Sequence, residues 1–428
     1  MVYGAFLPFY CEIYYSFNNR IMNKSTFYRE LYRFLEREDS GVWGWVNLSD
    51  EEYKNISLEL SNTKRNDGDI SYSAEEKELY PLRLKVRLKR LLYSYVRAAN
   101  KCGMLKHQME TNLDELENIC DALVLAYNKA SGGERSSAID ILSERIFKSI
   151  QFSDFNMVLA EMDEELRRKK KRTNLYEKDS HKEVCLYRMR PTEKYELFEE
   201  EGLSHIPFNL SHQTNNERYS ICGLPSLYLA SSAYGCWMEM NCPRIETVNI
   251  ALFKPKNDIK FLDLCYPNEN ESYDKHRMML LPIIVACDMP VKYPEANYKY
   301  EYTIPQLILE SLVKYRNNEM NGQVLGIRYI SVKRKTANLA YPYKSFKRLY
   351  YNYVFPPVEI KYEGQCPVIK ENFKFVKATT SFYMQNVEHE IPISKKYNDQ
   401  YEQGLFYRLE CHLGNEMLVS YNKGGALT

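Results

Sequence analysis

The amino-acid sequence predicts an α+β fold, with a helical N-terminal domain followed by a domain built on a mixed β-sheet. Before about residue 175, apolar residues recur with the period of a helix face. After Cys185 they gather instead in short segments separated by turns, as in strands. These segments alternate with helices without a strict βαβ rhythm, which favours α+β over a doubly wound sheet. We expect a helical domain over residues 1–178, and a sheet domain with a C-terminal extension over 179–428.

Helices are expected in order along the N-terminal domain. Phe27, Leu31, Phe34 and Leu35 fall on one helical face. Further helices are predicted over 82–99, over 113–130 with Asn112 or Thr111 as its N-cap, over 137–150, and from residue 153 into a charged tail. The basic residues within 82–99 are interpreted as a solvated helix face rather than a nucleic-acid site. The basic run at 167–172 and the polar segment up to residue 182 indicate a helix end and a linker.

The second domain alternates predicted strands with predicted helices. Strands are expected at 184–189, 226–230, 247–253, 259–264, 326–332 and 353–360. Helices are expected at 192–200, 233–241, 276–286 and 305–317.

Composition excludes several classes of protein. The chain of 428 residues carries a net charge of +1, so no general attraction to nucleic acid or to a membrane is expected. Its 11 cysteines include no Cys-x-x-Cys pair, which favours reduced thiols in the cytoplasm and no metal site. The apolar N-terminal segment 2–15 lacks a basic leader, and we expect it to be a buried element rather than a signal peptide. Neither a Gly-x-Gly-x-x-Gly nor a P-loop motif is present.

One stretch, residues 218–239, carries the clearest functional signal. Arg218 leads into a Gly-Leu-Pro turn and a short apolar strand, and a helix-like segment then delivers Glu239. A guanidinium suits a phosphate and a carboxylate suits a ribose, so the pair points to a nucleotide such as NAD. Three other pieces accompany it, at 186–190, 302–306 and 326–331.

Together these pieces resemble the RES domain, a family named for its arginine, glutamate and serine. The similar parts are His205-Ile-Pro-Phe, Arg218-Tyr-Ser, Gly-Leu-Pro-x-Leu-Tyr-Leu-Ala, Glu239 and Gly326-Ile-x-Tyr-x-Ser331, and they span about residues 184–360. The resemblance implies a fold similar to that of ADP-ribosyltransferases and the activity of an NAD-degrading toxin. NAD would then be the substrate, and no bound cofactor is expected.

The resemblance also implies roles for single residues. Arg188 matches the first-strand arginine of the family and Arg218 the second, Glu239 matches its glutamate, and Ser331 matches its serine. Tyr228 matches an aromatic position beside the nicotinamide ribose. Where the family has Gly-Gly-Arg-Trp-Asn, this chain has Asn-Glu-Arg-Tyr-Ser, so Tyr219 and Ser220 stand at positions expected to contact NAD.

The chemistry expected of such a site is cleavage of the nicotinamide–ribose bond. That cleavage builds positive charge on the ribose, which Glu239 can stabilise as in glycoside hydrolysis. Arg188 and Arg218 can clamp the diphosphate, and Ser331 can hydrogen-bond the nicotinamide or the ribose.

Several alternatives stay open for the activity and its control. Water or phosphate can accept the ADP-ribose (a glycohydrolase or a phosphorylase). A protein side chain can accept it in an ADP-ribosyltransferase, and an inactive fold can only sense nucleotide. A toxin–antitoxin system or antiviral defence would suit a toxin of this kind. We expect the helical domain to regulate the activity through an antitoxin, a trigger protein or a second copy of the chain.

Overall fold

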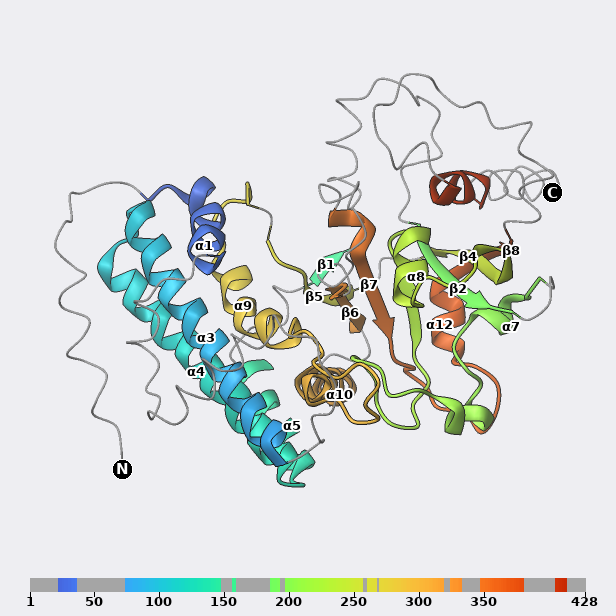
Figure 1. Cartoon of the computed structure of the whole chain (residues 1–428), viewed down its shortest axis with the longest axis horizontal. Coiled ribbons are helices and arrows are strands. Elements are labelled where there is room, and N and C mark those ends of the chain that lie inside the picture. The colour runs from blue at the N-terminus through green and yellow to red at the C-terminus, as the bar shows by residue number, and fades with distance from the viewer. Residues whose placement is uncertain are drawn as a thin grey trace, which may run out of the picture. The chain divides into compact units, whose positions relative to one another are not determined.

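The computed structural model describes residues 22–36, 74–147, 156–158, 185–192, 197–256, 260–267, 269–318, 324–332, 347–380 and 405–413. The chain forms two compact units, and it passes from one to the other at three points along the sequence (Figure 1). Unit 1 comprises Met1–Asn128 and Tyr266–Ala286, and unit 2 comprises Lys129–Cys265 and Cys287–Thr428. The domain boundary expected at residue 178, the basic linker and the apolar N-terminal segment lie outside the described residues.

Unit 1 is helical. Its helices are α1 (Phe27–Glu36), α3 (Ala74–Cys102), α4 (Lys106–Ser131) and α9 (Lys275–Cys287). The predicted face of α1 is confirmed, because Phe27 and Leu31 are fully buried. Tyr80 of α3 and Tyr127 of α4 join those helices, with ring centroids 4.6 Å apart.

The last helix of unit 1 comes from the middle of the chain and is held by polar contacts. The Tyr28 hydroxyl donates a 3.1 Å hydrogen bond to the carbonyl oxygen of Asp274. The buried side chain of Asn112 donates to the Tyr273 hydroxyl over 2.8 Å. The prediction that Asn112 or Thr111 caps a helix is wrong, because α4 begins at Lys106 and both residues lie inside it. Asn112 is instead the polar group that ties α4 to the segment before α9.

Unit 2 contains an eight-stranded mixed sheet with the strand order β1-β5-β6-β7-β3-β2-β4-β8. Among the described strands, only the neighbours β5 and β6 run parallel, so the unit is α+β and not doubly wound. The strands are β1 (Asn156–Val158), β2 (Leu186–Pro191), β3 (Leu227–Ala230), β4 (Val248–Pro255), β5 (Lys260–Leu264), β6 (Val324–Ile330), β7 (Tyr351–Phe355) and β8 (Phe373–Thr379). The six predicted strands are therefore confirmed, with shifted ends.

The other elements of unit 2 are mostly short helices. They are α5 (Arg135–Leu142), the π-helical turn η4 (Ser143–Phe147), α7 (Glu200–Leu203), η6 (Phe208–Gln213), α8 (Ala233–Glu239), η7 (Ile245–Thr247), η8 (Tyr300–Tyr302), α10 (Thr303–Asn318), η9 (Lys347–Tyr350) and α12 (Pro367–Asn372). A further helix covers residues 405–413.

Two helix predictions in this unit are wrong. The described residues 192 and 197–199 of the helix expected over 192–200 are not helical: the backbone N–H of Thr192 continues the sheet by donating to the carbonyl of Thr247, and Glu199 is extended. The helix expected from residue 153 is replaced at Asn156–Val158 by β1, whose backbone pairs with β5. The seventh and eighth strands, β1 and β8, were not predicted.

Apolar residues pack on both faces of the sheet. Successive residues of β2 point to opposite faces, and Leu186 and Tyr187 accordingly belong to two separate apolar clusters. The first cluster includes Ile369 of α12, and the second includes Ala233 of α8 and Leu409 of the helix 405–413. The helix that ends at Glu239 therefore rests on the sheet on one side and on the C-terminal helix on another.

The parallel pair β5–β6 is reinforced by a buried ion pair. The Arg328 guanidinium donates two hydrogen bonds to the carboxylate of Asp263, of 2.8 and 2.6 Å, from the paired position on the neighbouring strand. Gly326 is in β6, the strand that carries Arg328. A Cβ atom at this position would lie 2.1 Å from the carbonyl oxygen of Val354, so only glycine allows β7 to approach β6 this closely.

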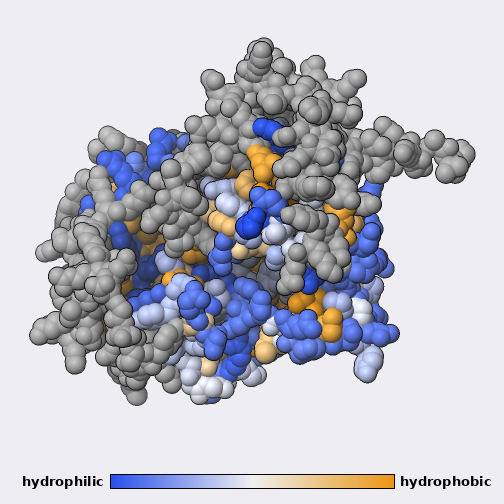
Figure 2. Space-filling model, turned by 45° about the vertical axis from the view of Figure 1, so that its right-hand side comes forward, coloured by the Kyte–Doolittle hydropathy of each residue, from blue (hydrophilic) through white to orange (hydrophobic). Residues whose placement is uncertain are grey.

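The described surface is mainly hydrophilic on the face drawn in Figure 2, with small separate apolar patches. The large apolar side chains exposed among the described residues are likewise scattered along the sequence: Leu105, Tyr298, Ile360 and Tyr362. None of the helices described is both long enough and apolar enough to cross a membrane.

Candidate active site

A cavity of about 970 Å³ opens in unit 2, and most of the residues expected from the sequence line it. Five of the seven are on its wall: Arg188, Arg218, Ser220, Tyr228 and Glu239. They come from β2, the loop before β3, β3 itself and the end of α8. Segments distant in sequence complete the wall with Lys299, Tyr302, Tyr329 and Asn352.

Glu239 is placed by a helix whose start is held at several points. The Ser232 hydroxyl accepts a 2.8 Å hydrogen bond from the N–H of Gly235 and donates to the carbonyl of Leu349 over 2.7 Å. This is the N-cap arrangement that satisfies an otherwise unpaired helical N–H group. The carboxylate of Glu410 accepts a third bond, of 2.7 Å, from the N–H of Ala233. Because α8 is only seven residues long, these contacts also fix the direction of its last residue, Glu239.

The carboxylate of Glu239 is held by a hydrogen bond from Asn352. Its side-chain amide donates a 2.6 Å hydrogen bond to Oε1 of Glu239. The residue is in β7, and only 4% of it is exposed. Sequence reasoning missed Asn352, although its signal was present. It is a lone polar residue in an apolar and aromatic strand, and the large majority of buried polar side chains have a hydrogen-bond partner.

Arg188 presents a partly buried positive charge to the cavity. Its guanidinium donates a long hydrogen bond, of 3.5 Å, to the carbonyl oxygen of Tyr228. Burial, together with the nearby charge of Arg190, lowers the pKa of Arg188 to about 10, so it stays protonated at neutral pH. Among the residues that the structure describes, no carboxylate lies within ion-pair distance of it. An arginine without such a partner in a cavity is suited to an anionic ligand.

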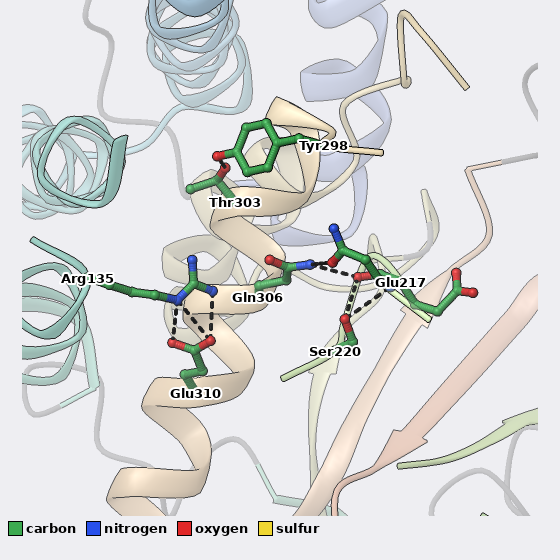
Figure 3. Close-up of polar contacts among 8 residues, drawn as sticks. Arg135, Glu217, Ser220, Tyr298, Thr303, Gln306 and Glu310 are labelled. Atoms are coloured by element: carbon green, nitrogen blue, oxygen red, sulfur yellow. Dashed lines mark hydrogen bonds and ion pairs between the residues drawn. The ribbon is translucent and has the colours of Figure 1, made fainter. Parts of the chain in front are cut away.

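Arg218 stands on a loop that is anchored to α10. Gln306 donates to the carbonyl of Glu217 over 3.0 Å and to the side chain of Asn216, and Ser220 bonds the backbone of Glu217 (Figure 3). The Arg218 guanidinium donates to the carbonyl of Cys287 over 2.8 Å. It also lies over the aromatic ring of Tyr302.

Two of the expected residues lie behind the cavity wall rather than on it. Tyr219 is 1% exposed, and its ring packs on that of Tyr329 with centroids 4.4 Å apart. Its carbonyl accepts a 2.7 Å hydrogen bond from the Tyr228 hydroxyl, so it fixes a residue that does face the cavity. Ser331 is 3% exposed and lies between Tyr329 and Val332, which both line the cavity, but is not part of the lining itself.

Several groups in this wall are unsuited to act as nucleophiles or bases. Burial raises the pKa of Tyr228 above its usual value. Burial, and then the charge of Glu239, raise the pKa of Tyr329. Burial likewise raises the pKa of the Cys236 thiol, which donates to the carbonyl of Tyr187 over 3.1 Å. All three stay protonated at neutral pH, which leaves carboxylates such as Glu239 to provide negative charge.

Comparison with known proteins gives one similarity to a curated protein. Over 276 residues the chain is 29% identical to a Bacillus subtilis (strain 168) protein named "Putative toxin YopC". The chain is therefore similar to a protein that is named as a toxin. The alignment covers 58% of this chain and 60% of that protein, so the chain spans about three fifths of its relative. No family model matches the sequence, the RES domain included, and no solved structure matches it.

Proposed function

We propose that the chain is a toxin that cleaves the nicotinamide–ribose bond of NAD⁺ and so depletes cellular NAD. The observation that carries this proposal is the composition of one cavity wall. It places the carboxylate of Glu239, held by Asn352, in the same cavity as Arg188 and Arg218. A carboxylate for the ribose and cations for a diphosphate are the groups that this substrate requires.

The reaction needs one bond broken and one formed. The C–N bond between ribose and nicotinamide breaks, and its electron pair leaves with nicotinamide as the neutral base. The ribose is left with positive charge, which Glu239 stabilises. Water then forms the new C–O bond and releases a proton, which gives ADP-ribose; phosphate in its place gives ADP-ribose 1″-phosphate. The hydrogen bond from Asn352 keeps the carboxylate oriented without reorganisation during this step.

The arginines would hold the rest of the substrate in place. Neither Arg188 nor Arg218 forms an ion pair within the described part of the chain, so both guanidinium groups are available to bind the phosphates. The volume of about 970 Å³ is at the upper end of the range typical of small-molecule sites and accommodates a dinucleotide. The similarity to a protein named as a toxin supports a toxic role for this activity.

The deciding experiment is incubation of the purified full chain with NAD⁺, with and without inorganic phosphate, followed by chromatography and mass spectrometry. Release of nicotinamide with ADP-ribose or its 1″-phosphate is the expected result and identifies the acceptor. A product attached to the protein would instead indicate an ADP-ribosyltransferase. Intact NAD⁺ after incubation of folded protein, over a range of pH and enzyme concentration, would overturn the proposal. The Glu239→Gln variant serves as the negative control.

A further inference from the structure

A second cation, Lys299, lies on the same wall of the cavity as Arg218. The two are joined through one aromatic ring: the Arg218 guanidinium carbon is 5.0 Å from the ring centroid of Tyr302, and the Lys299 ammonium is 5.4 Å from it. All three residues line the cavity. Lys299 also donates a 3.0 Å hydrogen bond to the carbonyl of Ala296, which fixes the position of its ammonium group.

Two positive charges placed on one ring repel each other. The negative face of the aromatic ring attracts each cation and so offsets part of this repulsion. Glu217 and Glu295 also line the cavity. However, in the part of the chain that the structure describes, neither Arg218 nor Lys299 has a carboxylate within ion-pair distance. Neither cation is therefore held in an ion pair, and both can contact an anionic ligand.

The positions of these residues are also well fixed. Tyr302 ends η8, directly before α10, while the Arg218 loop is anchored to the same helix by Gln306 (Figure 3). Both cations thus depend on one end of α10. Burial raises the pKa of the Tyr302 phenol, which therefore remains a hydrogen-bond donor at neutral pH.

We propose that Arg218, Lys299 and Tyr302 form a diphosphate-binding subsite, in which Lys299 supplies a second cation beside the arginine. This inference rests on the proposed function for its place in the reaction, because the diphosphate would be that of the dinucleotide. The ligand class is a nucleoside diphosphate, bound through its phosphates rather than through its base. Lys299 is then a substrate-binding residue that determines the preference for two phosphates over one.

The test uses calorimetric titration of the full chain with ADP, AMP and adenosine, which needs no turnover. The unmodified chain is expected to bind ADP more tightly than AMP, and AMP more tightly than adenosine. Lys299→Ala should weaken ADP binding by about 10- to 100-fold, the range for loss of one charge-assisted hydrogen bond, and should leave adenosine binding unchanged. Lys299→Arg should restore most of the affinity for ADP. Circular dichroism and melting temperature confirm that each variant is folded.

Lys292 provides a matched control in the same segment. Its ammonium also lies over a tyrosine ring, that of Tyr293 at 5.4 Å, but Lys292 does not line the cavity. Lys292→Ala should therefore leave ADP affinity unchanged within about twofold. Equal losses of ADP affinity in the two variants would indicate a general charge effect and would overturn the subsite. The subsite would also be overturned if the Lys299→Ala variant bound ADP as tightly as the unmodified chain.

The outcomes separate this inference from the proposed function. If ADP binding depends on Lys299 but NAD⁺ is never consumed, the subsite stands and the proposed reaction fails. If NAD⁺ is consumed and Lys299→Ala leaves both KM and ADP affinity unchanged, the reaction stands and the subsite fails.

Discussion

The side-chain amide of Asn352 donates a 2.6 Å hydrogen bond to Oε1 of Glu239, and so joins the sheet to the end of a helix. Asn352 is in β7, paired with Ala230 of β3 on one side and with Tyr329 of β6 on the other. The carboxylate is therefore oriented by a residue in the interior of the sheet, where displacement is costly because neighbouring strands would have to move with it.

Glu239→Gln should lower the rate of NAD⁺ cleavage by about 10²–10³-fold, since it removes a preorganised charge beside the ribose. The fold should be unaffected, because the glutamine carbonyl can still accept the hydrogen bond from Asn352. Steady-state rates and melting temperatures measure the two effects. Glu246→Gln, at a carboxylate in η7 that does not line the cavity, is the control. Turnover by Glu239→Gln at the rate of this control would remove Glu239 from the mechanism.

Asn352→Asp should shift the pH–rate profile. The substitution places two carboxylates at hydrogen-bond distance, and such a pair holds one shared proton to a higher pH than a single carboxylate does. The acid limb of the kcat profile should therefore move to higher pH by at least about one unit, with activity recovering as the pH rises. Asn352→Ala should lower kcat more than it raises KM. An acid limb that stays in place in the aspartate variant would show that Asn352 does not act on the catalytic carboxylate.

Arg218→Lys should weaken NAD⁺ binding by at least about tenfold, because a single ammonium cannot replace a planar group that bonds the Cys287 carbonyl and a phosphate together. The defect should fall mainly on KM. Arg244→Lys, at an exposed arginine of the same unit, should leave KM unchanged. An unaltered KM in Arg218→Lys would show that binding of NAD⁺ does not require the guanidinium group of Arg218.

Ser331→Ala should have a smaller effect than Glu239→Gln, since one neutral hydrogen bond contributes about 0.5–1.5 kcal/mol. Because Ser331 is buried behind the cavity wall, its hydroxyl can contribute either to NAD binding or to the stability of the fold, and measuring both kinetics and stability distinguishes the two roles. A role in binding NAD predicts a loss of up to about tenfold in kcat/KM with an unchanged melting temperature. A lower melting temperature with unaltered kinetics of the folded fraction would assign Ser331 to the fold alone.

Arg328→Ala should destabilise unit 2 by about 3–5 kcal/mol, because it leaves the Asp263 carboxylate buried without its partner. Urea unfolding measures this change. Lys129→Ala, which removes an exposed ion pair with Glu134 in the same unit, should cost no more than about 1 kcal/mol. Equal losses in the two variants would contradict the importance given to burial of the Arg328–Asp263 pair.

Local sequence patterns predicted much of this architecture. Periodicity located the face of α1 and six of the eight strands of the sheet. The stretch from Arg218 to Glu239, with Tyr228 added by the family resemblance, predicted residues that share one cavity. The short strand β1 escaped prediction because its three residues are held by pairing with β5, not by a pattern of their own. In contrast, β8 (Phe-Lys-Phe-Val-Lys-Ala-Thr) is rich in aromatic and β-branched residues and was detectable.

What could not be predicted depends on contacts between distant segments. Asn352 and Lys299 resemble any polar residue of a strand or loop until the fold brings them to Glu239 and Tyr302. Asn112 was interpreted as a helix cap from its neighbours alone, whereas its partner is Tyr273. Hydrogen-bond and ring partners of this kind depend on the topology of the fold, which the secondary-structure propensity of single residues does not predict.

The inclusion of α9 in unit 1 has a consequence for how the chain is made. The first three helices of this unit leave the ribosome early, but residues 266–286 follow roughly 8–30 s later at ordinary rates of synthesis. By then β1 to β5 of unit 2 have already emerged. The helical unit can be completed only after much of the sheet has been synthesised, and a fragment that starts near residue 179 would keep α9 without Tyr28 and Asn112, which hold its start. The two units are thus interleaved in the order of their synthesis.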